Sequence, residues 1–148
     1  MPSILRSFLA GLAGVVTAFV TVAVVETANH ALVPRGAVPA ATDPAAMAAY
    51  VASMPAMAFA GVALAWFLAV LAGTAVAVLI ARGRPRTFAL LVGGVIALSA
   101  VANFALIPHP AWFMALGLAA VALATWLAMR LAARLARPAA TTHPAATH

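Results

Sequence analysis

The sequence has no cysteine, no lysine and very little charge of either sign. Without cysteine the chain has no disulfide, no thiolate metal site and no cysteine nucleophile. Only 7% of its 148 residues are charged, whereas a soluble domain carries about a quarter. By contrast, 67% of the residues are hydrophobic and the mean hydropathy is +1.15. Because a small globule leaves much of its surface in water, this composition excludes an ordinary soluble domain and predicts a protein dissolved in lipid.

The net charge of +6 comes from arginines that stand at the ends of apolar stretches. Proteins that bind single-stranded nucleic acid interleave basic residues with aromatic residues along a groove. The arginines here lack that interleaving, so we expect membrane lipids, and no nucleic acid, as partners. The use of arginine alone and the abundance of alanine are typical of a GC-rich bacterial genome.

Four apolar stretches are long enough to cross a membrane, since about 20 helical residues span the hydrocarbon core. The first begins like a secretion signal, with Arg6 before an apolar run. However, the run is too long for a signal, and no small-residue cleavage site follows Val25, which favours an uncleaved span. The sequence therefore predicts an all-α membrane protein, a bundle of four transmembrane helices over residues 1–137. We expect the spans at about 8–30, 55–81, 87–107 and 111–130.

Proline, glycine and basic residues mark the connections between the spans. Asp43-Pro44 is typical of a helix start, with aspartate as N-cap and proline in the first turn, and predicts a helix near the membrane surface over residues 44–53. A tight basic turn follows the second span at Arg82–Arg86, and Pro108–Pro110 joins the last two spans. The Pro/Ala/Thr-rich residues 138–148 predict a disordered tail.

The distribution of arginine predicts the orientation of the bundle. With four spans, only Arg35 falls on one side of the membrane. The positive-inside rule places the opposite, arginine-rich side in the cytoplasm, with both termini (N-in/C-in). The seven arginines on that side are Arg6, Arg82, Arg84, Arg86, Arg130, Arg134 and Arg137.

Small residues recur within the predicted spans. Lipid provides no hydrophobic drive for helix association, so close helix contacts in a membrane depend on small side chains. Several are spaced about one turn apart and are candidates for such contacts: Gly11, Gly14, Gly61, Ala65, Ala69, Gly73, Gly93, Ala97, Ala100 and Gly117.

The side of the bundle opposite the arginines carries most of the other polar groups. Glu26 and His30 are four residues apart and share one helix face. A carboxylate near a helix C-terminus and close to lipid needs a partner, because the helix dipole and desolvation both oppose its charge. The candidate polar network at this end comprises Glu26, Asn29, His30, Asn103 and His109.

Three interpretations of this polar cluster remain open. In the first, the side chains form an interhelical hydrogen-bond network that stabilises one end of the bundle. In the second, Glu26 is the coupling residue of a small oligomeric proton-coupled transporter or an ion channel. In the third, Glu26, His30 and His109 bind a metal such as zinc, because carboxylate and imidazole are suitable ligands.

The chain resembles an uncharacterised family of small four-span bacterial inner-membrane proteins. The residues that carry the resemblance are Val25–Pro34, Asp43-Pro44 and Ile107–Phe113, and the likeness extends to about Arg137. It implies four-span architecture in the bacterial inner membrane and no particular chemistry. The small multidrug-resistance exporters also have a glutamate in the first of four spans, but Glu26 lies nearer the helix end here.

No phosphate-binding glycine loop, serine-nucleophile motif or carboxylate pair occurs in the sequence. We therefore expect no enzyme activity and no cofactor. The function most consistent with the residues is that of a non-enzymatic accessory or interaction subunit, within a homo-oligomer or a larger membrane complex.

Overall fold

A computed structural model describes residues 3–40 and 42–135 of the chain. Within these residues all regular structure is helical, and four of the five helices are long and apolar enough to cross a membrane. The predicted all-α, four-span architecture is therefore confirmed. The tail expected to be disordered, residues 138–148, lies outside the described residues. The helices are α1 (Ser3–Leu32), α2 (Pro44–Ser53), α3 (Ala56–Ala81), α4 (Pro85–Leu106) and α5 (Ala111–Leu135).

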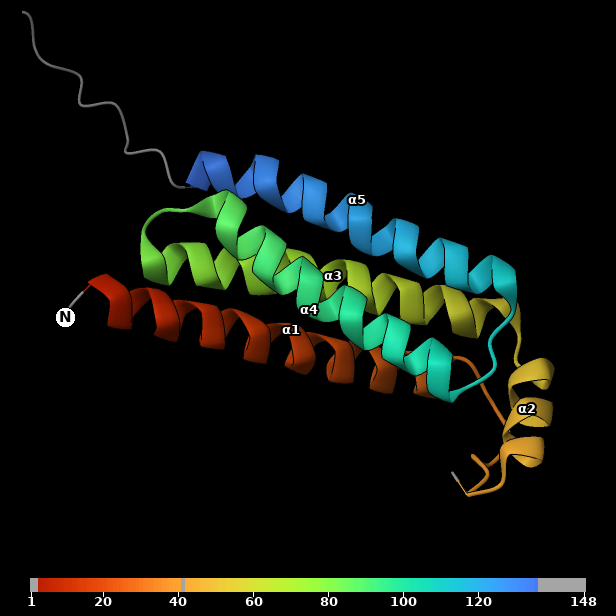
Figure 1. Cartoon of the computed structure of the whole chain (residues 1–148). Coiled ribbons are helices and arrows are strands. Elements are labelled where there is room, and N and C mark those ends of the chain that lie inside the picture. The colour runs from red at the N-terminus through yellow and green to blue at the C-terminus, as the bar shows by residue number, and fades with distance from the viewer. Residues whose placement is uncertain (1–2, 41, 136–148) are drawn as a thin grey trace, which may run out of the picture.

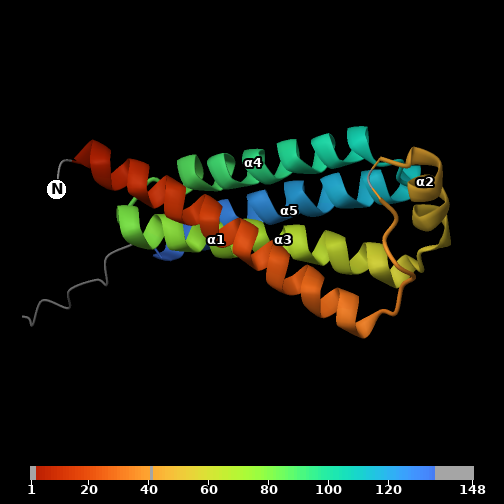
Figure 2. The ribbon, with the colours of Figure 1, turned by 90° about the horizontal axis from the view of Figure 1, so that it is seen from below.

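The four long helices form a bundle in which successive helices run in opposite directions (Figure 1). Helix α3 is central, because it contacts α1, α4 and α5. Helix α1 also contacts α4, and α4 contacts α5. Figure 2 shows α1 crossing α3 at a slant. The start of α1 and the end of α5 lie at the same end of the bundle, as a four-span chain requires.

The short helix α2 lies across the other end of the bundle (Figure 1). Its first turn is fixed as expected, because the Asp43 side chain accepts a hydrogen bond from the backbone N–H of Ala46 at 2.9 Å. Val51 is buried in the main core, and Tyr50 and Met54 pack against that core. Helix α2 therefore covers the end of the bundle opposite the two described termini.

The helices approach closely at glycines. A Cβ on Gly14 of α1 would lie 2.7 Å from the carbonyl oxygen of Gly73 in α3, so the two backbones touch there. A Cβ on Gly117 of α5 would lie 2.7 Å from the Trp66 ring of α3. Each contact is closer than any larger residue allows, in agreement with small-residue packing in membranes.

The outer surface of the bundle is apolar. Large side chains such as Leu79 of α3, Leu98 of α4 and Leu123 of α5 are more than half exposed. A soluble protein does not leave such surfaces along every long helix. The hydrocarbon of a bilayer solvates these apolar surfaces. The helices form their own backbone hydrogen bonds, which a bilayer requires because it offers none. The chain is thus a multi-pass membrane protein.

Candidate functional site

The polar residues predicted to cluster all lie toward the α2 end of the bundle, but they do not form one network. Asn29 is buried, Glu26 is half-buried and His30 is exposed, although all three belong to the last two turns of α1. Of the predicted set, Asn29 and His109 form side-chain hydrogen bonds within the described residues, and each is bonded to backbone. The predicted side-chain network is therefore replaced by separate local interactions.

Asn29 makes the one interhelical hydrogen bond of the predicted set within the described residues. Its Nδ2 atom donates to the carbonyl oxygen of Ala58 in α3 at 2.9 Å. The neighbouring position in α3 is Gly61, where any Cβ would overlap the Asn29 amide. The missing side chain of Gly61 thus provides the space in which Asn29 reaches the backbone of α3.

His109 is held in the loop between α4 and α5 by aromatic packing. Its Nδ1 lies 2.7 Å from the carbonyl oxygen of Ile107. A carbonyl only accepts, so Nδ1 carries the proton in this bond. The ring packs against Phe104 and Phe113, with both centroids 5.4 Å away. His109 is therefore part of an aromatic cluster that includes Phe59 and closes the end of the core.

Asn103 and Arg35 both have polar atoms without a hydrogen-bond partner among the described residues. The Oδ1 atom of Asn103 is buried and unpartnered. The same is true of Nε and Nη2 of Arg35, which lines a cavity of about 230 Å³ with Tyr50 and Ser53 of α2. Glu26, His30, Arg35 and Asn103 lie toward the same end of the bundle, but no hydrogen-bond network connects them among the described residues.

The predicted metal ligands do not come together. The described part of the chain contains no group of three or more histidine, aspartate or glutamate side chains placed to bind one metal ion. Glu26 and His30 share a helix face, but His109 is turned to the aromatic cluster and uses Nδ1 for the Ile107 carbonyl. In this geometry the three side chains share no point at which they could coordinate one metal ion.

Sequence reasoning treated the arginines only as markers of orientation and missed the cavities that they line. One cavity of about 570 Å³ is formed where the start of α1 meets the turn between α3 and α4. A second, of about 630 Å³, lies between the start of α4 and the end of α5. The signal in the sequence was the presence of hydroxyl residues beside arginines, as in Ser3–Ser7 and Arg84–Thr87.

No family model, curated protein or solved structure matches this chain.

Proposed function

We propose that this chain is a non-enzymatic accessory or interaction subunit of a membrane complex in the bacterial inner membrane. The proposed orientation places the arginine-rich end in the cytoplasm, where positively charged segments are retained. The observation that supports a role without transport is the filling of the bundle. Its described interior is packed with apolar side chains from the α2 end to the arginine-rich end.

Large aromatic residues occupy the α2 half of this interior. Phe113 is 1% exposed and its ring centroid lies 4.9 Å from that of Phe59 and 5.7 Å from that of Trp66. Toward the arginine-rich end, alanine, valine and Phe88 bring the helices together. A water-filled path lined by polar groups needs space that these side chains occupy. A bundle with a filled interior is suited to packing as a rigid unit against a partner protein.

The competing function is proton-coupled transport through Glu26, with a path formed between copies of the chain. Purified protein in liposomes under an imposed pH gradient separates the two functions. We expect the internal pH to follow that of protein-free liposomes. Proton flux that is lost in Glu26→Gln and kept in Asp43→Asn, the other acidic position, would contradict the proposal.

A partner is tested by cross-linking in the native membrane, followed by purification in mild detergent. We expect a protein that co-purifies in fixed stoichiometry and is also recovered without the cross-linker. Recovery of this chain alone, as a monomer or homo-oligomer under both conditions, would contradict the accessory role.

A further inference from the structure

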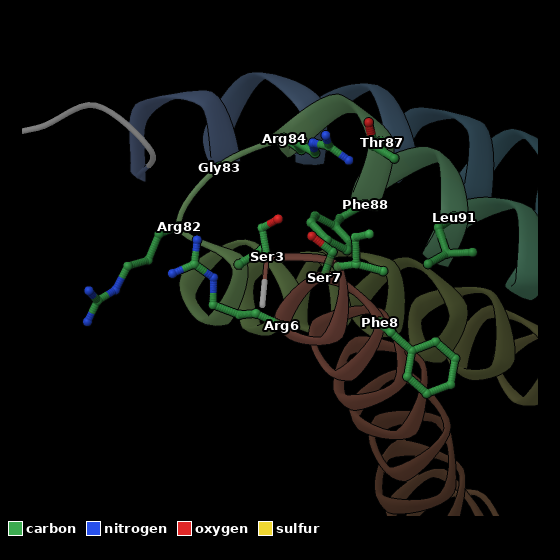
Figure 3. A pocket seen from close by; sticks show the side chains of 12 residues that line it. Ser3, Arg6, Ser7, Phe8, Arg82, Gly83, Arg84, Thr87, Phe88 and Leu91 are labelled. Carbon is green, nitrogen blue, oxygen red and sulfur yellow. The ribbon is translucent and has the colours of Figure 1, made fainter. Parts of the chain in front are cut away.

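The arginine-rich end of the bundle contains a cavity of about 570 Å³ that the packing described above leaves open. Figure 3 shows this cavity from close by. Its walls come from the first turns of α1, the turn between α3 and α4, and the first turns of α4. Its lining includes the side chains of Ser3, Arg6, Ser7, Phe8, Arg84 and Thr87.

The cavity is strongly positive. Arg6 of α1 and Arg82 and Arg84 of the turn all line it. The chain has only two acidic residues, and both lie toward the opposite end: Glu26 in the last turns of α1 and Asp43 at the start of α2. No carboxylate of the described residues therefore neutralises these arginines, and an anion would be attracted to them.

The backbone of the turn places the arginines around the cavity. Arg82 and Arg84 both adopt left-handed conformations, with φ of 56° and 55°, so the chain reverses within three residues. Arg84 is the N-cap of α4 and gives no side-chain hydrogen bond to the helix start. The first backbone N–H groups of α4, near Thr87, are thus left without a side-chain cap.

Polar and apolar groups are separated within the cavity. In Figure 3 the hydroxyls of Ser3 and Ser7 lie between the side chains of Arg6 and Arg84, whereas Arg82 extends away from them. Other lining residues, Phe8 and Leu91 among them, are apolar and lie farther from the turn in this view. Hydrogen-bond donors thus gather near the turn, and hydrocarbon surface continues toward the middle of the membrane.

We propose that this cavity binds the phosphate headgroup of an anionic phospholipid of the phosphatidylglycerol class. Arg6 and Arg84 would bind the phosphate oxygens, because guanidinium forms paired, charge-assisted hydrogen bonds with phosphate. Ser3, Ser7 and Thr87 add neutral donors, and an acyl chain follows the apolar wall. Basic pockets between transmembrane helices are a known way to bind anionic headgroups, and the volume is ample for one.

The second basic cavity provides a matched control. It is lined by Arg86, Arg130 and Arg134 and lies at the same end of the bundle. The guanidinium of Arg130 is already placed over the Trp126 ring, 5.0 Å from its centroid. Removing two arginines from either cavity changes the net charge and the positive-inside signal equally. A difference in lipid binding between the two double variants therefore reports a local site.

Native mass spectrometry of the detergent-purified protein, titrated with phosphatidylglycerol or phosphatidylcholine, measures lipid binding directly. We expect bound phosphatidylglycerol and little phosphatidylcholine. Arg6→Gln/Arg84→Gln should weaken phosphatidylglycerol binding about 25-fold, at about fivefold per arginine. Arg130→Gln/Arg134→Gln should weaken it less than about threefold. Equal losses in the two double variants, or equal binding of both lipids, would overturn the proposal.

Two further measurements test the site without removing an arginine. Ser7→Phe fills the cavity and keeps every arginine, so it should also reduce phosphatidylglycerol binding while the protein remains folded by circular dichroism. Unchanged binding in this folded variant would contradict the assigned location.

The second measurement is competition between the bound lipid and inorganic phosphate. If phosphate at the lipid's own concentration displaces it fully, the site recognises free phosphate and the lipid assignment is wrong.

Discussion

The side-chain amide of Asn29 in α1 occupies the space that a Cβ on Gly61 of α3 would fill. From there Nδ2 donates to the Ala58 carbonyl oxygen at 2.9 Å. An amide in hydrocarbon needs a partner, and a backbone carbonyl is accessible only where the facing helix has no side chain. The pair therefore fixes both the rotation and the position of the α1 end against α3.

Replacing Gly61 by alanine should push α1 and α3 apart at this contact. The new methyl would overlap the Asn29 amide, and overpacking of this kind costs about 1–3 kcal/mol. Gly94→Ala is the control, because it brings the same gain in helix propensity while its Cβ meets nothing within 4 Å, so it should not destabilise the protein. Unfolding in mixed detergent micelles, followed by tryptophan fluorescence, measures both. Equal stability of the two variants would show that the contact is not tight.

Asn29→Ala removes the interhelical hydrogen bond itself. Such bonds are worth about 1 kcal/mol in membrane proteins, so the free energy of unfolding should fall by about that amount. Thr27→Ala is the control, because Thr27 is exposed and donates only within its own helix, to the Ala23 carbonyl. A larger loss for Thr27→Ala than for Asn29→Ala in the same micelle assay would contradict the assigned role.

Phe113→Ala tests the aromatic cluster that closes the α2 end of the core. Phe113 is 1% exposed and contacts the rings of Phe59, Trp66 and His109. The substitution should lower the free energy of unfolding by about 2 kcal/mol. Most of this comes from packing lost around the space that the ring leaves, because lipid supplies little hydrophobic drive. Phe8→Ala, at a side chain that is 66% exposed, should be nearly neutral. The prediction fails if thermal unfolding temperatures of the two variants coincide.

Removal of metal should have no effect on the fold. Glu26, His30 and His109 do not form a metal-binding group in this structure. Dialysis against a chelator should therefore leave the unfolding temperature and circular dichroism unchanged. Elemental analysis should show the same trace metal in the parent protein and in His109→Ala. A stoichiometric metal that disappears in His109→Ala would restore the metal site.

Hydropathy and helix signals in the sequence predicted the main architecture because they are local. Four apolar stretches gave the four spans, and Asp43-Pro44 marked the start of α2, where the structure also begins that helix. The start of α1 was placed at residue 8, whereas the helix begins at Ser3. Ser3, Arg6 and Ser7 lie outside the apolar run that hydropathy detects, but a helix continues into the headgroup region when its polar residues reach water there.

The actual partners of the polar side chains at the α2 end depend on how each helix is rotated, which hydropathy does not describe. Successive residues turn by about 100° around a helix. Asn29 is eleven residues from the buried Ala18, so the two point within about 20° of each other, whereas His30 points about 120° away. The row of small residues in α1 thus contained the signal for an inward Asn29 and an outward His30. The arginine-lined cavity depends on the turn at Arg82–Arg84, which hydropathy does not describe.

Four spans require the two ends of the bundle to face opposite sides of the membrane, and the proposed orientation has the arginine-rich end in the cytoplasm. Because the chain has no cysteine, a single introduced thiol reports its own location. Gly83 lies in the arginine-rich turn and Gly36 in the α1–α2 loop, and a Cβ at either meets nothing within 4 Å. A membrane-impermeant maleimide should label Gly36→Cys in intact spheroplasts and Gly83→Cys only after permeabilisation. Labelling of both positions from the same side would contradict the four-span topology, and the reverse pattern would contradict the orientation.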